Sequence, residues 1–204
     1  MLRLLDHPLT THIVTHLRDA STKPATFRTL AYQISLLLAL EVTRDLRMRE
    51  IEVQTPLEAH KGRVLAEALV IVPVLRAGIA MAQPFTDLFP DVSVGYIGLE
   101  RDHATAIARS YYCKLPSLET KKVLIVDPML ATGGSAVQAV QLVRAHGGAN
   151  PTLVCIVAAP EGIKAVEAVD PDIPIFSAAL DRELNSRKYI LPGLGDFGDR
   201  LYGT

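Results

Sequence analysis

Apolar residues along the chain follow two spacings, one typical of amphipathic helices and one typical of buried strands. Between residues 26 and 48 they recur every three or four positions, which predicts a long amphipathic helix, and residues 11–18 predict a shorter one ahead of it. After residue 50, short apolar runs alternate with helical segments and one polar stretch. Strands are expected over 68–74, 92–99, 123–126, 153–159 and 173–180, helices over 78–89 with a break at Pro84, 135–146 and 162–169, and a polar loop over 100–110.

The predicted strands are apolar throughout, and helices separate them. This pattern is typical of an α/β fold with a mostly parallel central sheet that helices cover on both faces. A length of 204 residues fits one domain spanning 1–204. Ligands of such sheets bind beyond the carboxyl ends of the strands. The segments to search are therefore LRAG (75–78), ERDH (100–103), DPMLATGGS (127–135) and the residues after Leu180.

Charge and composition exclude several classes of function. The 21 basic side chains are balanced by 22 acidic ones, so the chain has no electrostatic footprint for nucleic acid, although one local pocket can still be basic. Apolar runs are far shorter than a membrane span, and the N-terminal segment lacks a signal-peptide pattern. Cys113 and Cys155 have no CxxC partners, so we expect reduced, buried thiols in a cytoplasmic protein.

One pair of histidines has the spacing of metal ligands. His12 and His16 stand four residues apart on the shorter predicted helix. A metal site needs further ligands, and none is evident nearby in the sequence. We therefore favour a solvated helix face and expect no metal site built from protein ligands.

The segment VLIVDPMLATGGSA (123–136) carries the strongest chemical signal. Asp127 follows a buried strand, where a carboxylate can reach hydroxyl groups, and residues 132–135 lead into a helix whose first N–H groups lack intrahelical partners. Glycines, hydroxyls and a helix N-terminus together suit a phosphate group. A glycine turn with a Ser or Thr N-cap is the alternative. The sequence contains neither GxxxxGK[ST] nor a strand-linked GxGxxG motif.

This segment resembles the phosphoribosyl diphosphate (PRPP) loop of type I phosphoribosyltransferases. Most of those proteins have two successive acids where this chain has Asp127 and Pro128, and the DPMLATGGS form is similar to that of the uracil phosphoribosyltransferase family. The resemblance extends along the chain through DHPL (6–9), FRTLA (27–31), VLRAG (74–78), VAAPEGI (157–163) and YILPGLGDFGDRLYGT (189–204). It implies the type I phosphoribosyltransferase fold, with a flexible loop covering the site and a C-terminal base-binding segment.

The resemblance also implies roles for individual residues. Arg76, Arg101 and Asp127 are the expected catalytic residues, with both arginines on the diphosphate and the acid on the ribose hydroxyls. The PRPP-binding set is Arg76, Arg101, Asp127, Pro128, Met129, Leu130, Ala131, Thr132, Gly133, Gly134, Ser135 and Asp196. Around Arg101 the chain departs from the family pattern, since Glu100 stands where an apolar residue is usual, and Arg109 is an alternative for this role. His103 on the same loop has no evident partner for acid–base catalysis.

Uracil is the base that the resemblance implies. Ile190, Gly195, Asp196 and Phe197 would bind it, in a segment with little side-chain bulk whose peptide groups can approach a planar ring closely. The implied reaction joins uracil and PRPP to give UMP and diphosphate, with Mg²⁺ held mainly through PRPP. Family members are homo-oligomers, and some are activated by GTP. The alternatives are an RNA-binding regulator with this fold, against which the balanced charge argues, and a purine phosphoribosyltransferase, against which the Asp-Pro pair and the PGLGD segment argue.

Overall fold

A nine-stranded sheet forms the centre of the computed structural model, which describes residues 1–101 and 108–204, without the side chains of 101, 108 and 109. Its main strands lie in the order β1-β11-β10-β8-β4-β6-β7, and β5 and β9 pair with β4 and β10. The strands are β1 (Leu2–Leu4), β4 (Leu69–Leu75), β5 (Ser93–Val94), β6 (Tyr96–Arg101), β7 (Ala108–Lys114), β8 (Lys122–Val126), β9 (Met129–Leu130), β10 (Pro151–Ala158) and β11 (Ile175–Leu180). Within this sheet, the described neighbouring strands are parallel except for β6 and β7. The predicted α/β class is confirmed.

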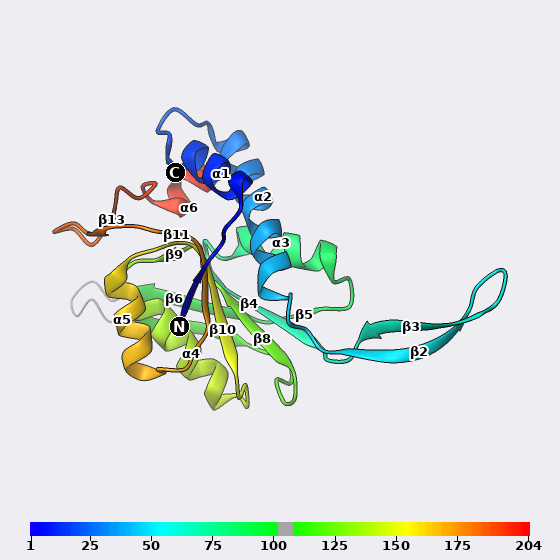
Figure 1. The fold of residues 1–204 in the computed structure, drawn as a ribbon. Coiled ribbons are helices and arrows are strands. Elements are labelled where there is room, and N and C mark those ends of the chain that lie inside the picture. Colours follow the sequence, from blue (N-terminus) through cyan, green and yellow to red (C-terminus); the bar gives the residue numbers. More distant parts are fainter. Residues whose placement is uncertain (102–107) are drawn as a thin grey trace.

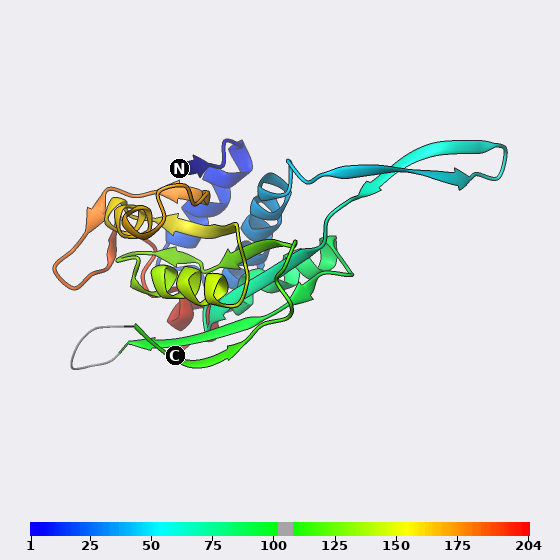
Figure 2. The ribbon, with the colours of Figure 1, turned by 90° about the horizontal axis from the view of Figure 1, so that it is seen from below.

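Helices cover both faces of the sheet (Figures 1 and 2). One face packs against α1 (Pro8–Arg18), α2 (Pro24–Val42), α3 (Ile79–Leu88) and α6 (Phe197–Tyr202), and the other against α4 (Gly134–Ala145) and α5 (Pro160–Val169). Successive residues of a strand serve opposite faces, as Leu124 joins the first core and Ile125 the second. Both are fully buried, which explains why the strand sequences are apolar at every position.

Several predicted details of the elements are wrong. The strand predicted over 92–99 is two strands, β5 and β6, on either side of Gly95. The long helix ends at Val42 instead of residue 48, because the buried stripe stops there and Thr43 turns its hydroxyl back to the Ala39 carbonyl at 2.6 Å. Helix α3 runs through Pro84 without a break, since the helix is anchored by buried Met81 and Phe85 on either side of that residue. Residues 100–101 and 108–110, predicted as parts of a polar loop, belong to β6 and β7, which pair antiparallel with Arg101 opposite Ala108. The rest of that predicted loop, 102–107, lies outside the described residues.

A long hairpin projects away from the body of the molecule (Figures 1 and 2). It consists of β2 (Met48–Gln54) and β3 (Ala59–Leu65), which pair from Met48 and Leu65 at its base to Gln54 and Ala59 near its tip. Most of its residues are exposed on both faces, including Leu57 at 94%. The sequence analysis predicted no element here.

The C-terminal segment crosses back over the first helices. A small hairpin of β12 (Glu183–Leu184) and β13 (Ile190–Leu191) leads into α6, which the sequence analysis also missed. Arg28 of α2 donates to the Leu201 carbonyl at 2.8 Å. Cys155 is buried and Cys113 half-buried, both as free thiols. Within the described residues, no helix combines the length and apolar character needed to cross a membrane.

Candidate active site

The carboxyl ends of β4, β8 and β10 bring the predicted site segments to one edge of the sheet. Pro73 is level with Val126, and Val126 is level with Val154, so Arg76 and Asp127 follow neighbouring strands at similar height. Gly78 allows the two loops to approach closely, because a Cβ on it would lie 2.5 Å from the Val126 carbonyl oxygen. Arg76 itself is exposed at this edge.

The 127–135 loop is fixed by its backbone along β10. The Pro128 carbonyl accepts hydrogen bonds from the N–H groups of Ile156 and Val157, both at 3.0 Å, and the Leu130 carbonyl accepts one from Ala159 at 2.9 Å. The loop therefore forms a short extra strand, β9, beside β10 before it turns into α4. This placement explains how Pro128, which has no N–H to donate, fits a position next to a strand.

The turn into α4 depends on two glycines. Gly133 has a φ of 83°, in the left-handed region, and a Cβ on it would lie 2.7 Å from Cβ of Ala165. A Cβ on Gly162, in the first turn of α5, would lie 2.6 Å from the Ala131 carbonyl oxygen. The loop and α5 thus touch backbone to backbone, while Gly134 and Ser135 at the start of α4 remain exposed toward any ligand. Exposed N–H groups at a helix N-terminus suit a phosphate.

Gly133→Ala is expected to disrupt this turn. The substitution forces a side chain into a left-handed conformation and against Ala165, so the free energy of unfolding should fall by about 1–3 kcal/mol. The distorted turn should also raise the KM for a phosphate-bearing substrate by about tenfold or more. Denaturant titration and steady-state kinetics measure the two effects.

Gly134→Ala is the matched control for stability, because the nearest atom to its added Cβ is 3.9 Å away and its φ is negative. Equal unfolding free energies for the two variants would contradict this account of Gly133.

Asp127 sits in an electrostatically unusual place. Burial raises its pKa to about 7, against the opposing effect of the hydrogen bond that it accepts from the Met129 backbone. Its own N–H donates to the Val154 carbonyl at 3.1 Å, which ties the residue to β10. A carboxylate that has lost its water here gains from hydroxyl donors of a ligand.

A cavity of about 290 Å³ joins the 127–135 loop to the C-terminal segment. It is lined by Met129, Ala131, Arg187, Lys188, Tyr189, Ile190, Gly195, Asp196 and Phe197. Six of these residues were predicted as PRPP or uracil ligands. Arg187, Lys188 and Tyr189 were missed, although they directly precede Ile190 in the sequence. A larger hollow of about 610 Å³ lies around Arg47, Lys122 and Asn150, at the opposite ends of the strands, away from the predicted chemistry.

The walls of this cavity are held from both ends of the chain. Asp196 caps α6 by accepting the Asp199 N–H at 2.9 Å, and the Phe197 ring meets the Phe27 ring edge to face at 5.1 Å. The Tyr202 hydroxyl donates to the Arg76 carbonyl at 3.5 Å, so α6 also reaches the loop after β4. The structure therefore brings Arg76, Asp127 and Asp196 to one region of the molecule.

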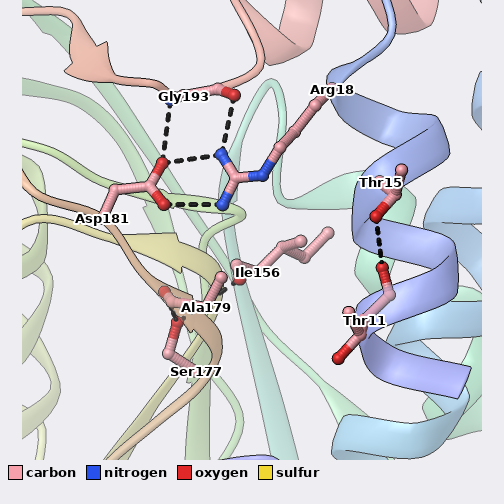
Figure 3. Close-up of polar contacts among 8 residues, drawn as sticks. All are labelled: Thr11, Thr15, Arg18, Ile156, Ser177, Ala179, Asp181 and Gly193. Atoms are coloured by element: carbon pink, nitrogen blue, oxygen red, sulfur yellow. Dashed lines mark hydrogen bonds and ion pairs between the residues drawn. The ribbon is translucent and has the colours of Figure 1, made fainter. Parts of the chain in front are cut away.

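Two arginines fix the turn that precedes Gly195. Arg18 binds both carboxylate oxygens of Asp181, at 2.8 and 2.6 Å, and donates to the Gly193 carbonyl at 2.8 Å (Figure 3). Arg200 donates to the Leu194 carbonyl at 2.8 Å. The sequence analysis missed these contacts, since Arg18 and Asp181 are 163 positions apart.

Some predicted residues lie outside the described part of the structure. Arg101 is the last residue of β6, but its side chain is among those not described, as is that of Arg109, and His103 falls within 102–107. Their proposed roles stay predictions. His12 and His16 meet edge to face at 4.7 Å between ring centroids. Over residues 1–101 and 108–204, no three His, Cys, Asp or Glu side chains cluster in a way that could hold a metal ion.

Comparison with known proteins places the chain among its relatives. The sequence profile of a family described as "Uracil phosphoribosyltransferase" matches residues 4–204. The chain belongs to the uracil phosphoribosyltransferase family. A protein of that name from Dictyoglomus turgidum is 50% identical over 206 residues, covering all of both chains, and one from Symbiobacterium thermophilum is 49% identical, covering 98% and 97%. The chain is thus an enzyme of the phosphoribosyltransferase class.

Solved structures agree with this membership. The AQ2163 protein from Aquifex aeolicus is similar with a TM-score of 0.94 and 36% identity, over 100% of this chain and 99% of that one. A purine phosphoribosyltransferase from Pyrococcus horikoshii is similar with a TM-score of 0.51 and 17% identity, over 74% and 87%. The second likeness concerns the fold alone, which is that of type I phosphoribosyltransferases.

Proposed function

We propose that residues 1–204, acting as one domain, convert uracil and PRPP to UMP and diphosphate. The observation that carries this proposal is the cavity in which Met129 and Ala131, from the loop after β8, face Ile190 and the residues that open α6. The loop that leads into the proposed phosphate-binding turn thus forms one side of the space proposed for the base. The family membership supports the same reaction.

The proposed mechanism assigns one task to each part of the site. Diphosphate leaves the anomeric carbon of the ribose as a ring nitrogen of uracil approaches, and negative charge develops on the leaving group. Arg76 and Arg101 would stabilise that charge, and Asp127 would orient the ribose hydroxyls. Residues 132–135 would hold the 5-phosphate at the start of α4, and Pro128, Met129, Leu130 and Ala131 would shape the floor of the PRPP site.

Base selection is assigned to the C-terminal wall of the cavity. Ile190 and Phe197 are buried and would contact the faces of the ring, while Gly195 and Asp196 are exposed and would present polar groups to its edge. Uracil offers carbonyl and N–H groups that peptide groups can match. Cytosine has an amino group in place of one carbonyl, which leaves polar groups unpaired and disfavours it.

We propose that PRPP, and not a cluster of protein side chains, binds the magnesium ion. The described residues offer isolated carboxylates at the site and no cluster of ligands, which suits an ion that reaches the protein already bound to PRPP oxygens. When bound, the ion would neutralise charge on the diphosphate. Arg76 and Asp127 are the residues that would hold such a complex in place.

UMP formation from labelled uracil, PRPP and Mg²⁺ tests the proposal. Uracil should be converted at a kcat/KM at least about 100-fold above those for cytosine, hypoxanthine and orotate. GTP added to the same assay tests the further proposal that this chain, like some members of the family, is activated by it. If uracil is inert while PRPP still binds, the catalytic proposal fails, and RNA binding becomes the function to measure.

We also propose that the enzyme is a cytoplasmic homo-oligomer whose subunits meet through the β2–β3 hairpin. A two-stranded hairpin is marginally stable alone, and this one exposes Met48, Val53, Leu57 and Leu65 at 37–94%. The long helix α2, by contrast, buries its apolar stripe on its own sheet.

Val53→Asp with Leu57→Ser should lower the solution mass of the enzyme. The substitutions place polar groups where the partner's apolar surface would lie, so we expect the subunit equilibrium to shift toward monomer by about tenfold or more. Light scattering coupled to gel filtration measures the mass. Lys61→Gln on the same hairpin is the control, and an unchanged mass for the double variant would move the interface elsewhere.

A further inference from the structure

We propose that Arg18 and Asp181 are positioning residues for the base loop, defined here as residues 190–197, and that they set its affinity for the pyrimidine and its discrimination against cytosine. The inference rests on the proposed function, since it concerns how the same cavity selects its base. Neither residue was singled out by its sequence, and neither lines the cavity.

The pair holds both polar groups of one residue in the loop. The Gly193 carbonyl accepts from Arg18 at 2.8 Å, and the Gly193 N–H donates to Asp181 at 2.8 Å (Figure 3). The carboxylate and guanidinium are themselves joined by two hydrogen bonds. Gly193 is therefore fixed in both position and orientation, which a single contact would not achieve.

The backbone conformation at Gly193 determines the orientation of the loop. Its φ is 61°, and a Cβ on it would lie 2.1 Å from the Ile190 carbonyl oxygen, so the chain folds back directly over Ile190 at this point. Ile190 before this turn and Gly195 after it both line the cavity. A rotation at Gly193 would change the spacing between these two residues.

The pair connects the loop to the central sheet and to α1. Asp181 directly follows β11, is 6% exposed, and donates its N–H to the Ala158 carbonyl at the end of β10 at 2.8 Å. Arg18 is the last residue of α1, whose apolar face packs into the first core. Asp181 thus ties the base loop to the same edge of the sheet that carries the 127–135 loop. Because one sheet edge would hold both loops, it would also align the base with the ribose.

Changes to the pair should act on the base and not on PRPP. In Asp181→Asn, the amide replaces one acceptor by a donor that faces the donors of Arg18 or Gly193, so the loop loses its fixed geometry. We expect the KM for uracil to rise by about 10–100-fold, the KM for PRPP to change by less than about threefold, and the preference for uracil over cytosine to narrow by about tenfold.

Arg18→Lys gives a second, milder variant. Lysine keeps the charge, but its single ammonium cannot reproduce the fork that spans both Asp181 oxygens and the Gly193 carbonyl. The KM for uracil should rise by about 3–10-fold, and the double variant with Asp181→Asn should be no worse than Asp181→Asn alone, because both changes remove one unit.

The matched control is Asp170→Asn. Asp170 is equally buried, at 6% exposure, and pairs with Arg144 at the other end of the sheet. It should lose stability, measured by thermal unfolding, without a selective rise in the KM for uracil.

Three outcomes separate the hypotheses. A wild-type enzyme that converts no uracil contradicts the proposed function, whatever the variants do. An active wild type together with an unchanged KM for uracil in Arg18→Lys and Asp181→Asn overturns the positioning role. Equal rises in the KM values for uracil and PRPP, matched by Asp170→Asn, would also overturn it, since they would indicate a general loss of stability.

Discussion

Asp127→Asn should lower kcat/KM for PRPP by about 100–1,000-fold while making the folded protein more stable at alkaline pH. The loss of activity follows from the place of the carboxylate, at the end of β8 and beside the turn into α4. An amide presents a donor and one neutral acceptor to the two ribose hydroxyls, which need charged acceptors for strong binding. Steady-state kinetics with PRPP as the varied substrate measure the effect, and an activity within threefold of wild type would remove Asp127 from the mechanism.

The gain in stability follows from the raised pKa. Because burial raises the pKa of Asp127 from 3.8 to about 7, the folded protein holds this proton more tightly than the unfolded chain does. The resulting stabilisation is complete below pH 4 and is lost as the pH rises through 7, where the folded state must accommodate a desolvated charge. The asparagine variant avoids that charge and should be more stable than wild type by about 2 kcal/mol at pH 8, with a smaller difference at pH 5.

Thermal unfolding at the two pH values tests this prediction. Asp91→Asn is the matched control, because it makes the same substitution at an exposed carboxylate far from this loop in the sequence. An asparagine variant at position 127 that is less stable than wild type at pH 8 would contradict the assigned cause of the pKa shift.

Arg76→Ala is the second change with a large expected effect, a fall of about 1,000-fold in kcat with little change in unfolding temperature. Arg76 is exposed, so its side chain contributes little to the core, but its backbone is held by Gly78 packed on Val126 and by the Tyr202 hydroxyl. The guanidinium would therefore meet the departing diphosphate from a fixed backbone position.

Lysine at this position separates charge from geometry. Arg76→Lys should recover about tenfold of the lost kcat, because the ammonium restores the charge without the bidentate contact. Arg44→Ala provides the control, since Arg44 pairs with Glu41 on the surface near the end of α2. Near-normal kcat in both Arg76 variants would show that another cation stabilises the leaving group.

The sequence predicted the strands that are buried on both faces of the sheet. Residues 123–126 and 153–158 are apolar at every position because they face two cores, and this signal needs no knowledge of the rest of the chain. It also located the 127–135 loop, since the loop directly follows such a strand. The six cavity residues that were predicted came from resemblance to a family, and periodicity alone would have left residues 192–198 as a glycine-rich turn.

The sequence analysis did not predict three other features of the structure, each for a physical reason. The β2–β3 hairpin has no face toward the core, so its alternation of charged and apolar residues, MREIEVQ, gives no burial pattern to detect. The contact of Arg18 with Asp181 depends on tertiary placement, and neither neighbouring sequence encodes it. The end of α2 at Val42 depends on where the sheet below it stops, although Leu46 continues the helical spacing.

The two halves of the cavity differ in when the growing chain can complete them. The loop after β8 is held by β10 and α5, all within residues 122–169. The C-terminal segment that contains the base loop is held by contacts between residues 163–183 positions apart, through Arg18, Arg28 and Arg200. Contacts of such separation form after the intervening chain has been synthesised and has collapsed. A nascent chain can therefore form the proposed phosphate-binding loop before residues 181–201 emerge, whereas the proposed base-binding loop can be fixed only after those residues have met α1.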